Sequence, residues 1–219
     1  MKIFLDTANR EYIKKLIPTG VIDGVTTNPS LLSKEGSDVK SVLRDICAMV
    51  SGPVSVEVVE KHPDAVLKQA REIAAFAKNV VVKIPFALEY MPAIKTLADD
   101  GIALNITLVF TPLQALMVAK LGVAYISPFL GRWDDIGVDS IDLLEQTMSI
   151  QETYDFDSEI LAASVRTIIQ WQEVAQTGVD IATVPPALFE QVFKHPLTER
   201  GIALFDADWQ KLGKTSLFE

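Results

Sequence analysis

The sequence predicts an α/β fold, a (β/α)8 TIM barrel with an additional C-terminal helix. Short β-branched runs alternate eight times with longer amphipathic segments in the 219 residues, and strands separated by helices form parallel sheets. This length lies near the low end of the range for one such barrel. Most strand runs also carry a polar residue towards the carboxyl end, where a closed barrel would bring them to one mouth. The alternative, an open doubly wound sheet, would spread them over many strand spacings.

The predicted strands are short apolar runs separated by helical patterns. The strands cover residues 2–7, 24–28, 54–59, 80–85, 103–110, 125–130, 159–165 and 181–185. Helical patterns between them cover residues 63–78, 111–122, 140–154 and 165–178. In the first of these, Val66, Ala70 and Ile73 recur on one helical face. The second opens with Thr-Pro and ends at Gly122, which is the expected helix punctuation.

Residues 196–216 follow the eighth unit and predict one more helix. Ile202, Phe205, Trp209 and Leu212 recur there at helical spacing and form one apolar stripe. Because no ninth helix is needed to close the barrel, the stripe should cover a barrel end or pack on a neighbouring subunit. We therefore expect a single barrel domain over residues 1–219, a helical extension at 196–216 and a homo-oligomer.

The composition of the chain limits the compartments and the binding partners that we expect for the protein. The formal charge of −9, from 29 acidic and 20 basic residues, argues against an extended nucleic-acid surface or an anionic membrane partner. The single Cys47 leaves no internal disulfide and fits a reducing compartment. The first residues reach Asp6 without the apolar run of a signal peptide, and no apolar stretch is long enough to span a bilayer. The expectation is a soluble cytoplasmic protein.

Lys83 lies in the apolar run "NVVVKIPF". Lysine is almost never fully buried unless it is paired. An ammonium ion in apolar surroundings is costly, so buried lysines tend to be neutral, and a neutral amine is a nucleophile towards carbonyls. The alternative is a strand-end lysine whose head group snorkels into water, and this stretch alone favours it.

Polar residues towards the carboxyl ends of the other strands make a functional interpretation stronger. Each has a structural explanation when taken singly, such as turn chemistry before Pro29 or an ion pair with Lys83. Together, and unpaired, they would cost several kcal/mol of desolvation, which is a poor design for a purely structural cluster. The set is Asp6, Thr26, Asn28, Glu57, Lys83, Asn105, Thr107, Ser127, Ser164 and Thr183.

The make-up of this cluster indicates imine chemistry on a polyhydroxylated carbonyl compound. His62 and His195 precede prolines and have no second ligand at metal spacing, so no metal set is expected. The chain also lacks a Gly-rich phosphate loop and a dinucleotide fingerprint. Lys83 would attack a ketone, Glu57 would shuttle protons through a water, and Asp6 would take a hydroxyl proton to break the adjacent carbon–carbon bond.

Two arginines follow the sixth and seventh predicted strands. Arg132 lies in "SPFLGRWDD" and Arg166 in "AASVRT". Both loops would reach the same mouth, where two guanidinium groups form a good phosphate clamp. The alternative, about equally supported by the local sequence, is that Arg132 pairs with Asp134 or Asp135 on its own loop.

Motifs in nearly every predicted βα loop resemble the small-subunit transaldolases. They are "FLDTAN", "DGVTTNPSLLSKEG", "GPVSVEVV", "VVVKIP", "NITLVF", "ISPFLGRWDDIG" and "AASVR", which together span residue 1 to about residue 212. The resemblance implies transfer of a dihydroxyacetone unit from fructose 6-phosphate or sedoheptulose 7-phosphate to erythrose 4-phosphate or glyceraldehyde 3-phosphate, in the pentose phosphate pathway. It implies no cofactor, because the lysine imine is itself the electron sink. It also suggests rings of five subunits, as a pentamer or a decamer.

The resemblance implies a role for each matching residue. Lys83 matches the Schiff-base lysine, and Asp6 matches the acid–base aspartate that deprotonates the C4 hydroxyl. Glu57 and Thr107 match the pair that holds the catalytic water. The matching substrate-binding residues are Asn28, Asn105 and Ser127 for hydroxyl groups and Arg132, Ser164 and Arg166 for phosphate, with Thr26 and Phe129 beside them.

Two alternatives remain at this point. Fructose 6-phosphate aldolases are similar, but they carry a glutamine at the position of Glu57 and a tyrosine at that of Phe129, so both residues favour a transaldolase. An apolar Phe129 would also help to protect the imine from hydrolysis. Phe86, Ala87 and Trp133 depart from the usual pattern and leave the sugar-chain preference open. A non-catalytic sugar-phosphate-binding barrel would keep the two arginines but would not need a desolvated lysine beside two carboxylates.

Overall fold

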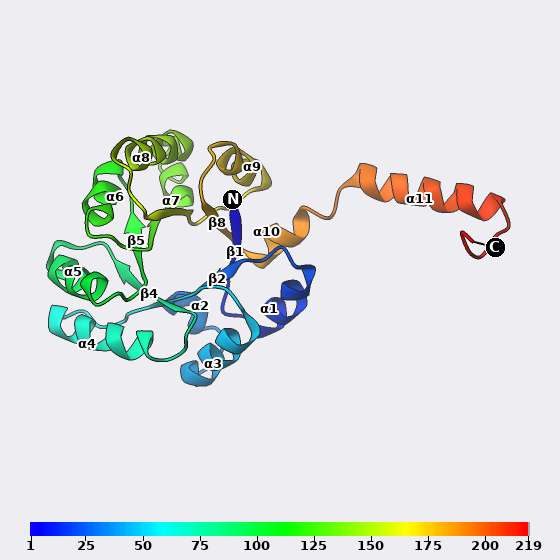
Figure 1. Ribbon diagram of the computed structural model, residues 1–219. Coiled ribbons are helices and arrows are strands. Elements are labelled where there is room, and N and C mark those ends of the chain that lie inside the picture. The colour runs from blue at the N-terminus through cyan, green and yellow to red at the C-terminus, as the bar shows by residue number, and fades with distance from the viewer. Residues whose placement is uncertain (219) are drawn as a thin grey trace.

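The computed structural model describes residues 1–218, whose eight strands form a closed parallel barrel in the order of the sequence (Figure 1). The strands are β1 (Lys2–Asp6), β2 (Gly24–Thr26), β3 (Val54–Glu57), β4 (Val80–Pro85), β5 (Leu104–Val109), β6 (Tyr125–Pro128), β7 (Glu159–Ala162) and β8 (Ile181–Val184). Because β1 pairs with β8 from Lys2 to Leu5, the sheet has no free edge. The predicted (β/α)8 barrel is confirmed, and the open sheet is excluded.

Helices surround the barrel and follow each strand (Figure 1). They are α1 (Arg10–Leu16), α2 (Pro29–Leu32), α3 (Val39–Met49), α4 (Pro63–Ala74), α5 (Met91–Asp99), α6 (Pro112–Ala119), α7 (Leu130–Asp134), α8 (Ser140–Tyr154), α9 (Ile168–Gln176), α10 (Pro186–Gln191) and α11 (Pro196–Lys211), with 3-10 turns at Ile17–Thr19 and Leu88–Tyr90. The four helical patterns named from the sequence are all present. One of them, α8, has the predicted bounds, and the other three helices are shorter than predicted.

Seven of the eight strands end earlier than the sequence predicted, and this places three candidate residues, Asn28, Phe129 and Ser164, beyond the ends of their strands. Asn28 is not a strand residue: it caps α2, where its Oδ1 accepts a hydrogen bond of 2.9 Å from the backbone N–H of Leu31. The following Pro29 fits the first turn of a helix, so the chain leaves the sheet at this point. Ser164 is also not in a strand, because it lies beyond β7 with a φ of 61°.

Two apolar layers hold the barrel. The larger cluster lies between the sheet and its helices and includes Val25, Val82 and Ile94, all buried. A smaller cluster of Phe4, Leu161, Ala163 and Ile181 is packed with Tyr125 and Phe129. Side chains two apart on a strand share a face, so Phe4 lies on the same face as Asp6, and Ile181 on that of Thr183. The smaller cluster therefore fills the barrel interior beneath the polar residues.

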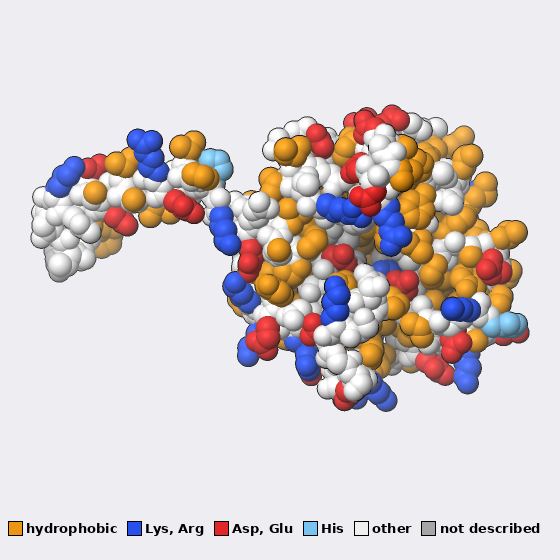
Figure 2. All heavy atoms as spheres, turned by 180° about the vertical axis from the view of Figure 1, so that it is seen from behind, with side chains coloured by type: hydrophobic (Ala, Val, Ile, Leu, Met, Phe, Trp, Pro, Cys, Tyr) orange, Lys and Arg blue, Asp and Glu red, His pale blue; other side chains and the backbone are white. Residues whose placement is uncertain are grey.

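The predicted C-terminal helix forms α11, which projects away from the barrel beyond α10 (Figure 1). None of its residues is buried, and Phe205 remains 76% exposed. Figure 2 shows apolar side chains along this arm. The stripe therefore does not cover an end of its own barrel, and its packing on a neighbouring subunit stays a prediction. No helix within residues 1–218 has the length and apolar character needed to cross a membrane.

Candidate active site

A cavity of about 410 Å³ opens at the carboxyl ends of the strands, a volume typical of small-molecule sites. It is lined by every predicted site residue: Asp6, Thr26, Asn28, Glu57, Lys83, Asn105, Thr107, Ser127, Phe129, Arg132, Ser164 and Arg166. Thr183, noted in the sequence, also lines it, as do Ser30 and Leu108, which sequence reasoning missed. Figure 2 shows basic side chains gathered beside a central hollow.

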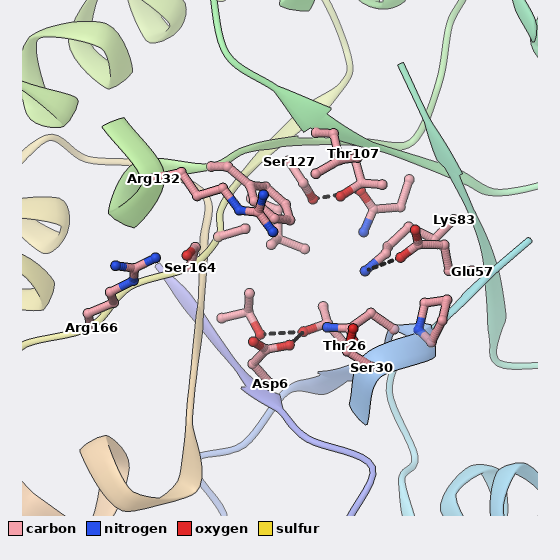
Figure 3. Close-up of a pocket in the computed structure, with 18 residues that line it drawn as sticks. Asp6, Thr26, Ser30, Glu57, Lys83, Thr107, Ser127, Arg132, Ser164 and Arg166 are labelled. Atoms are coloured by element: carbon pink, nitrogen blue, oxygen red, sulfur yellow. Dashed lines mark hydrogen bonds and ion pairs between the residues drawn. The ribbon is translucent and has the colours of Figure 1, made fainter. Parts of the chain in front are cut away.

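Lys83 lies within β4 and points into the cavity (Figure 3). Its residue is only 5% exposed. The Nζ atom lies 3.0 Å from Oε2 of Glu57, the paired residue on β3, and donates a 2.8 Å hydrogen bond to the carbonyl oxygen of Thr27. The alternative of a lysine that snorkels into water is therefore wrong. The amine is held inside the barrel by one carboxylate and one carbonyl.

Asp6 ends β1 and faces the same cavity next to Thr26 on β2. Thr26 Oγ1 donates to Asp6 Oδ1 at 3.0 Å, and the hydroxyl of Thr183 lies 2.6 Å from that of Thr26. Because a hydroxyl has one proton, Thr183 must donate to Thr26 while Thr26 donates to Asp6. Burial raises the pKa of Asp6, and the charge of Lys83 and the Thr26 hydrogen bond oppose this rise. A carboxyl with a raised pKa is suited to general acid–base chemistry near neutral pH.

Asn105 on β5 is fully buried in a chain of polar side chains. Ser127 donates to its Oδ1 at 2.7 Å, and its Nδ2 donates to Ser55 Oγ at 3.1 Å. These two bonds fix the orientation of the amide. Ser55 was not singled out from the sequence, although it lies two residues before Glu57 and therefore on the same face of β3.

Thr107 lies at an irregularity in β5. The pairing of β5 with β6 shifts register between Ile106 and Val109, and Leu108 has a φ of 57°. Such a bulge re-aims the side chains around it, so Thr107 and the adjacent Leu108 both line the cavity. Thr107 Oγ1 is buried without a hydrogen-bond partner. A buried hydroxyl of this kind is available to a bound water or ligand.

Arg132, Ser164 and Arg166 lie on the opposite side of the cavity from Lys83 and Glu57 (Figure 3). The guanidinium carbon of Arg132 lies 5.8 Å from the centre of the Phe129 ring. Phe129 in turn packs edge-on against Phe110, with ring centres 6.0 Å apart. Arg132 is thus supported by an aromatic side chain.

The alternative pairing of Arg132 with its own loop is wrong. Asp135 forms an ion pair with Arg166 instead. Asp134 accepts a hydrogen bond from Gln170, which also accepts from the backbone N–H of Arg166 at 2.7 Å. The two acidic residues therefore connect the end of α7 to the loop after β7.

Gly131 permits this connection. A Cβ at Gly131 would lie 2.3 Å from the carbonyl oxygen of Ser164 and 2.6 Å from Nε of Arg166. The N–H of Gly131 donates to the same Ser164 oxygen at 3.1 Å. Only a residue without a side chain allows the two loops to approach this closely.

Within residues 1–218 no group of three or more histidine, cysteine, aspartate or glutamate side chains is arranged to hold a metal ion. The polar groups of the cavity are instead an amine, carboxylates, amides, hydroxyls and guanidinium groups.

Sequence comparison identifies the family. A family model described as Transaldolase/Fructose-6-phosphate aldolase matches residues 3–216. The chain belongs to this family. It is 49% identical over 210 residues to a probable transaldolase of Methanococcus maripaludis strain C5, covering 96% of this chain and 98% of the relative. It is 48% identical over 217 residues to a probable transaldolase of Phenylobacterium zucineum strain HLK1, covering 99% and 100% respectively. The resemblance seen in the sequence motifs is confirmed, and it indicates an enzyme of the transaldolase type.

A more distant likeness supports the fold alone. A crystal structure from Coccidioides immitis, named as a candidate fructose-1,6-biphosphate aldolase, superposes with a TM-score of 0.57 at 15% identity. The match covers 90% of this chain and 81% of the other. At this identity the shared feature is the barrel fold.

Proposed function

We propose that the protein is a transaldolase that transfers a dihydroxyacetone unit between sugar phosphates through a Schiff base on Lys83. The observation that carries the proposal is the buried Lys83 amine, 3.0 Å from the Glu57 carboxylate, across the cavity from two arginines. The donor would be fructose 6-phosphate or sedoheptulose 7-phosphate. The acceptor would be erythrose 4-phosphate or glyceraldehyde 3-phosphate.

The first step forms the imine. Glu57 takes the proton of the Lys83 ammonium group. The neutral Nζ then attacks the C2 carbonyl of the donor, and the new N–C bond gives a carbinolamine. Glu57 returns this proton to the C2 hydroxyl, which leaves as water and gives the protonated imine. Glu57 is close enough to the amine to relay the protons through a water, and the free hydroxyl of Thr107 offers this water a second partner. The same water later hydrolyses the product imine.

The second step breaks the bond between C3 and C4. Asp6 takes the proton of the C4 hydroxyl, the aldose phosphate leaves, and the electron pair moves into the imine to give a three-carbon enamine on Lys83. Burial raises the pKa of Asp6, which makes its carboxylate a stronger base. When the acceptor aldehyde arrives, the enamine attacks it and Asp6 returns the proton. The aldose exchange thus needs no outside acid or base.

The remaining lining residues support binding. Asn28, Asn105 and Ser127 offer amide and hydroxyl groups to the dihydroxyacetone hydroxyls. Arg132, Ser164 and Arg166 would bind the phosphate group, and we call these three residues the phosphate wall. Guanidinium groups suit phosphate because their donors match its oxygen geometry.

Glu57 and Phe129 favour transfer over simple cleavage. Phe129 has no hydroxyl that could protonate the enamine, and its apolar ring lines the cavity and packs against Phe110. The enamine would therefore persist until an acceptor arrives.

We further propose that the enzyme works in the cytoplasm, in the pentose phosphate pathway, as a homo-oligomer.

Borohydride trapping tests the proposal. The protein is incubated with fructose 6-phosphate, reduced, digested and mapped by mass spectrometry, with and without erythrose 4-phosphate. We expect a reduced three-carbon adduct on Lys83 that is depleted by erythrose 4-phosphate. Lys95, an exposed lysine paired with Asp99, is the internal control and should stay unmodified. Absence of the adduct from Lys83 would reject the imine mechanism and favour a non-catalytic sugar-phosphate-binding barrel.

A further inference from the structure

Arg166 packs against α7 through the outer part of its side chain. Its Cδ and Nε lie so near Gly131 that a Cβ there would be 2.9 and 2.6 Å away. Its guanidinium then pairs with Asp135, four residues after Gly131 and so on the same helical face. The arginine that would bind the phosphate therefore already has an anionic partner.

The partner is placed to compete with a ligand. Arg166 lines the cavity, whereas Asp135 is not among the lining residues. Both side chains are about half exposed, at 47% for Arg166 and 53% for Asp135. Surface ion pairs of this kind are weak and exchange readily. A phosphate ester can therefore share or take the guanidinium, but it must do so beside a fixed negative charge.

Of the two arginines in the phosphate wall, only Arg166 pairs with Asp135. Asp134 is occupied by the Gln170 amide. Arg132 lies against the Phe129 ring and forms no ion pair with any part of the chain that the structure describes. The phosphate wall thus has one arginine without a carboxylate partner and one whose charge is partly compensated. This asymmetry is not needed for positioning alone, because Gly131 and the Gln170 contact already hold the Arg166 backbone and stem.

We propose that Asp135 is a resident counter-anion of the phosphate wall, which pairs with Arg166 in the free protein and lowers its affinity for phosphate. When a phosphate ester dissociates, Arg166 can pair with Asp135 again, which favours release of the ester. This inference rests on the proposed function for the assignment of phosphate to Arg132, Ser164 and Arg166. It adds a residue that tunes the site without touching the substrate.

The substitution Asp135→Asn separates charge from position. Asparagine keeps a side-chain oxygen that can accept from Arg166 but removes the negative charge. Calorimetric titration with inorganic phosphate should show a dissociation constant about two- to fivefold lower than in the unmodified protein, which is the range of an exposed ion pair. The difference should shrink as sodium chloride is raised, because salt screens the removed charge.

Two further variants complete the test. Asp100→Asn removes the same charge from a comparable exposed pair with Arg71, 2.7 Å apart between α4 and α5, and should leave phosphate affinity unchanged. In the background of Arg166→Gln, Asp135→Asn should no longer tighten binding, because its effect passes through Arg166. Weaker or unchanged phosphate binding in Asp135→Asn, or a gain that persists without Arg166, would overturn the proposal.

Phosphate titration needs no turnover, so its outcome is distinct from that of borohydride trapping. A protein that traps at Lys83 but shows no gain in Asp135→Asn keeps the proposed function and loses this inference. If the unmodified protein binds no phosphate, both the phosphate wall and the role of Asp135 are rejected, whatever happens at Lys83.

Discussion

Replacing Gly131 with alanine is the most direct test of how the phosphate wall is built. The added Cβ would lie 2.3 Å from the carbonyl oxygen of Ser164, more than 1 Å inside an ordinary contact distance of about 3.5 Å. That oxygen belongs to the backbone and also accepts the N–H of Gly131. The clash can be relieved only if the Ser164–Arg166 loop moves away from α7.

The energetic effect follows from two opposing terms. Forcing a methyl group into a packed site costs about 1–3 kcal/mol. Alanine is favoured over glycine in a helix by up to about 1 kcal/mol, which offsets part of this cost. We therefore expect Gly131→Ala to lower the free energy of unfolding by roughly 0–2 kcal/mol. A shift of about 1 Å at Ser164 and Arg166 should raise KM for a sugar phosphate roughly tenfold or more.

The assay compares KM for fructose 6-phosphate with KM for unphosphorylated fructose, together with thermal unfolding. Gly201→Ala in α11 is the matched control, because a Cβ there meets nothing within 4 Å. It should leave both KM values unchanged and stabilise the chain by up to about 1 kcal/mol. The reasoning is refuted if Gly131→Ala leaves KM for the phosphorylated donor unchanged. It is also refuted if KM rises equally for fructose, since the effect would then not lie at the phosphate wall.

Three further predictions concern acid–base chemistry, the catalytic water and assembly. Thr26→Val removes a hydrogen bond that lowers the pKa of Asp6. That pKa should therefore rise further, and the acid limb of the pH profile of kcat/KM should move to higher pH. An unmoved acid limb would exclude Asp6 as the base. Thr107→Val removes a buried hydroxyl that has no protein partner, so Tm should not fall. Loss of the hydroxyl that would hold the catalytic water should lower kcat about 100-fold. A lower Tm with a normal kcat would instead show a structural role for Thr107. Deletion of residues 196–219 removes the exposed apolar stripe of α11. Light scattering should then show a monomer rather than a large assembly. An unchanged assembly would reject the packing of α11 on a neighbouring subunit.

The sequence by itself determined the barrel and the chemical composition of its mouth. Alternation of β-branched runs with amphipathic segments is a local property, and it led to eight parallel strands in the observed order. The side-chain period of two placed Asn105 and Thr107 on one face. In a closed barrel the carboxyl ends of all strands meet, so polar residues near those ends could be grouped without coordinates. Lys83 and Glu57 were grouped in this way.

Only the tertiary structure decided what each polar group contacts. Asp135 pairs with Arg166 rather than with Arg132, because the loop after β7 packs on Gly131, a contact between segments far apart in the chain. The left-handed backbone at Leu108 and Ser164 also gave no local signal, since neither residue favours that conformation. Such positions depend on the surrounding packing that holds them. Periodicity is written in neighbouring residues, whereas ion pairs, bulges and close loop contacts arise when the closed barrel brings distant residues together.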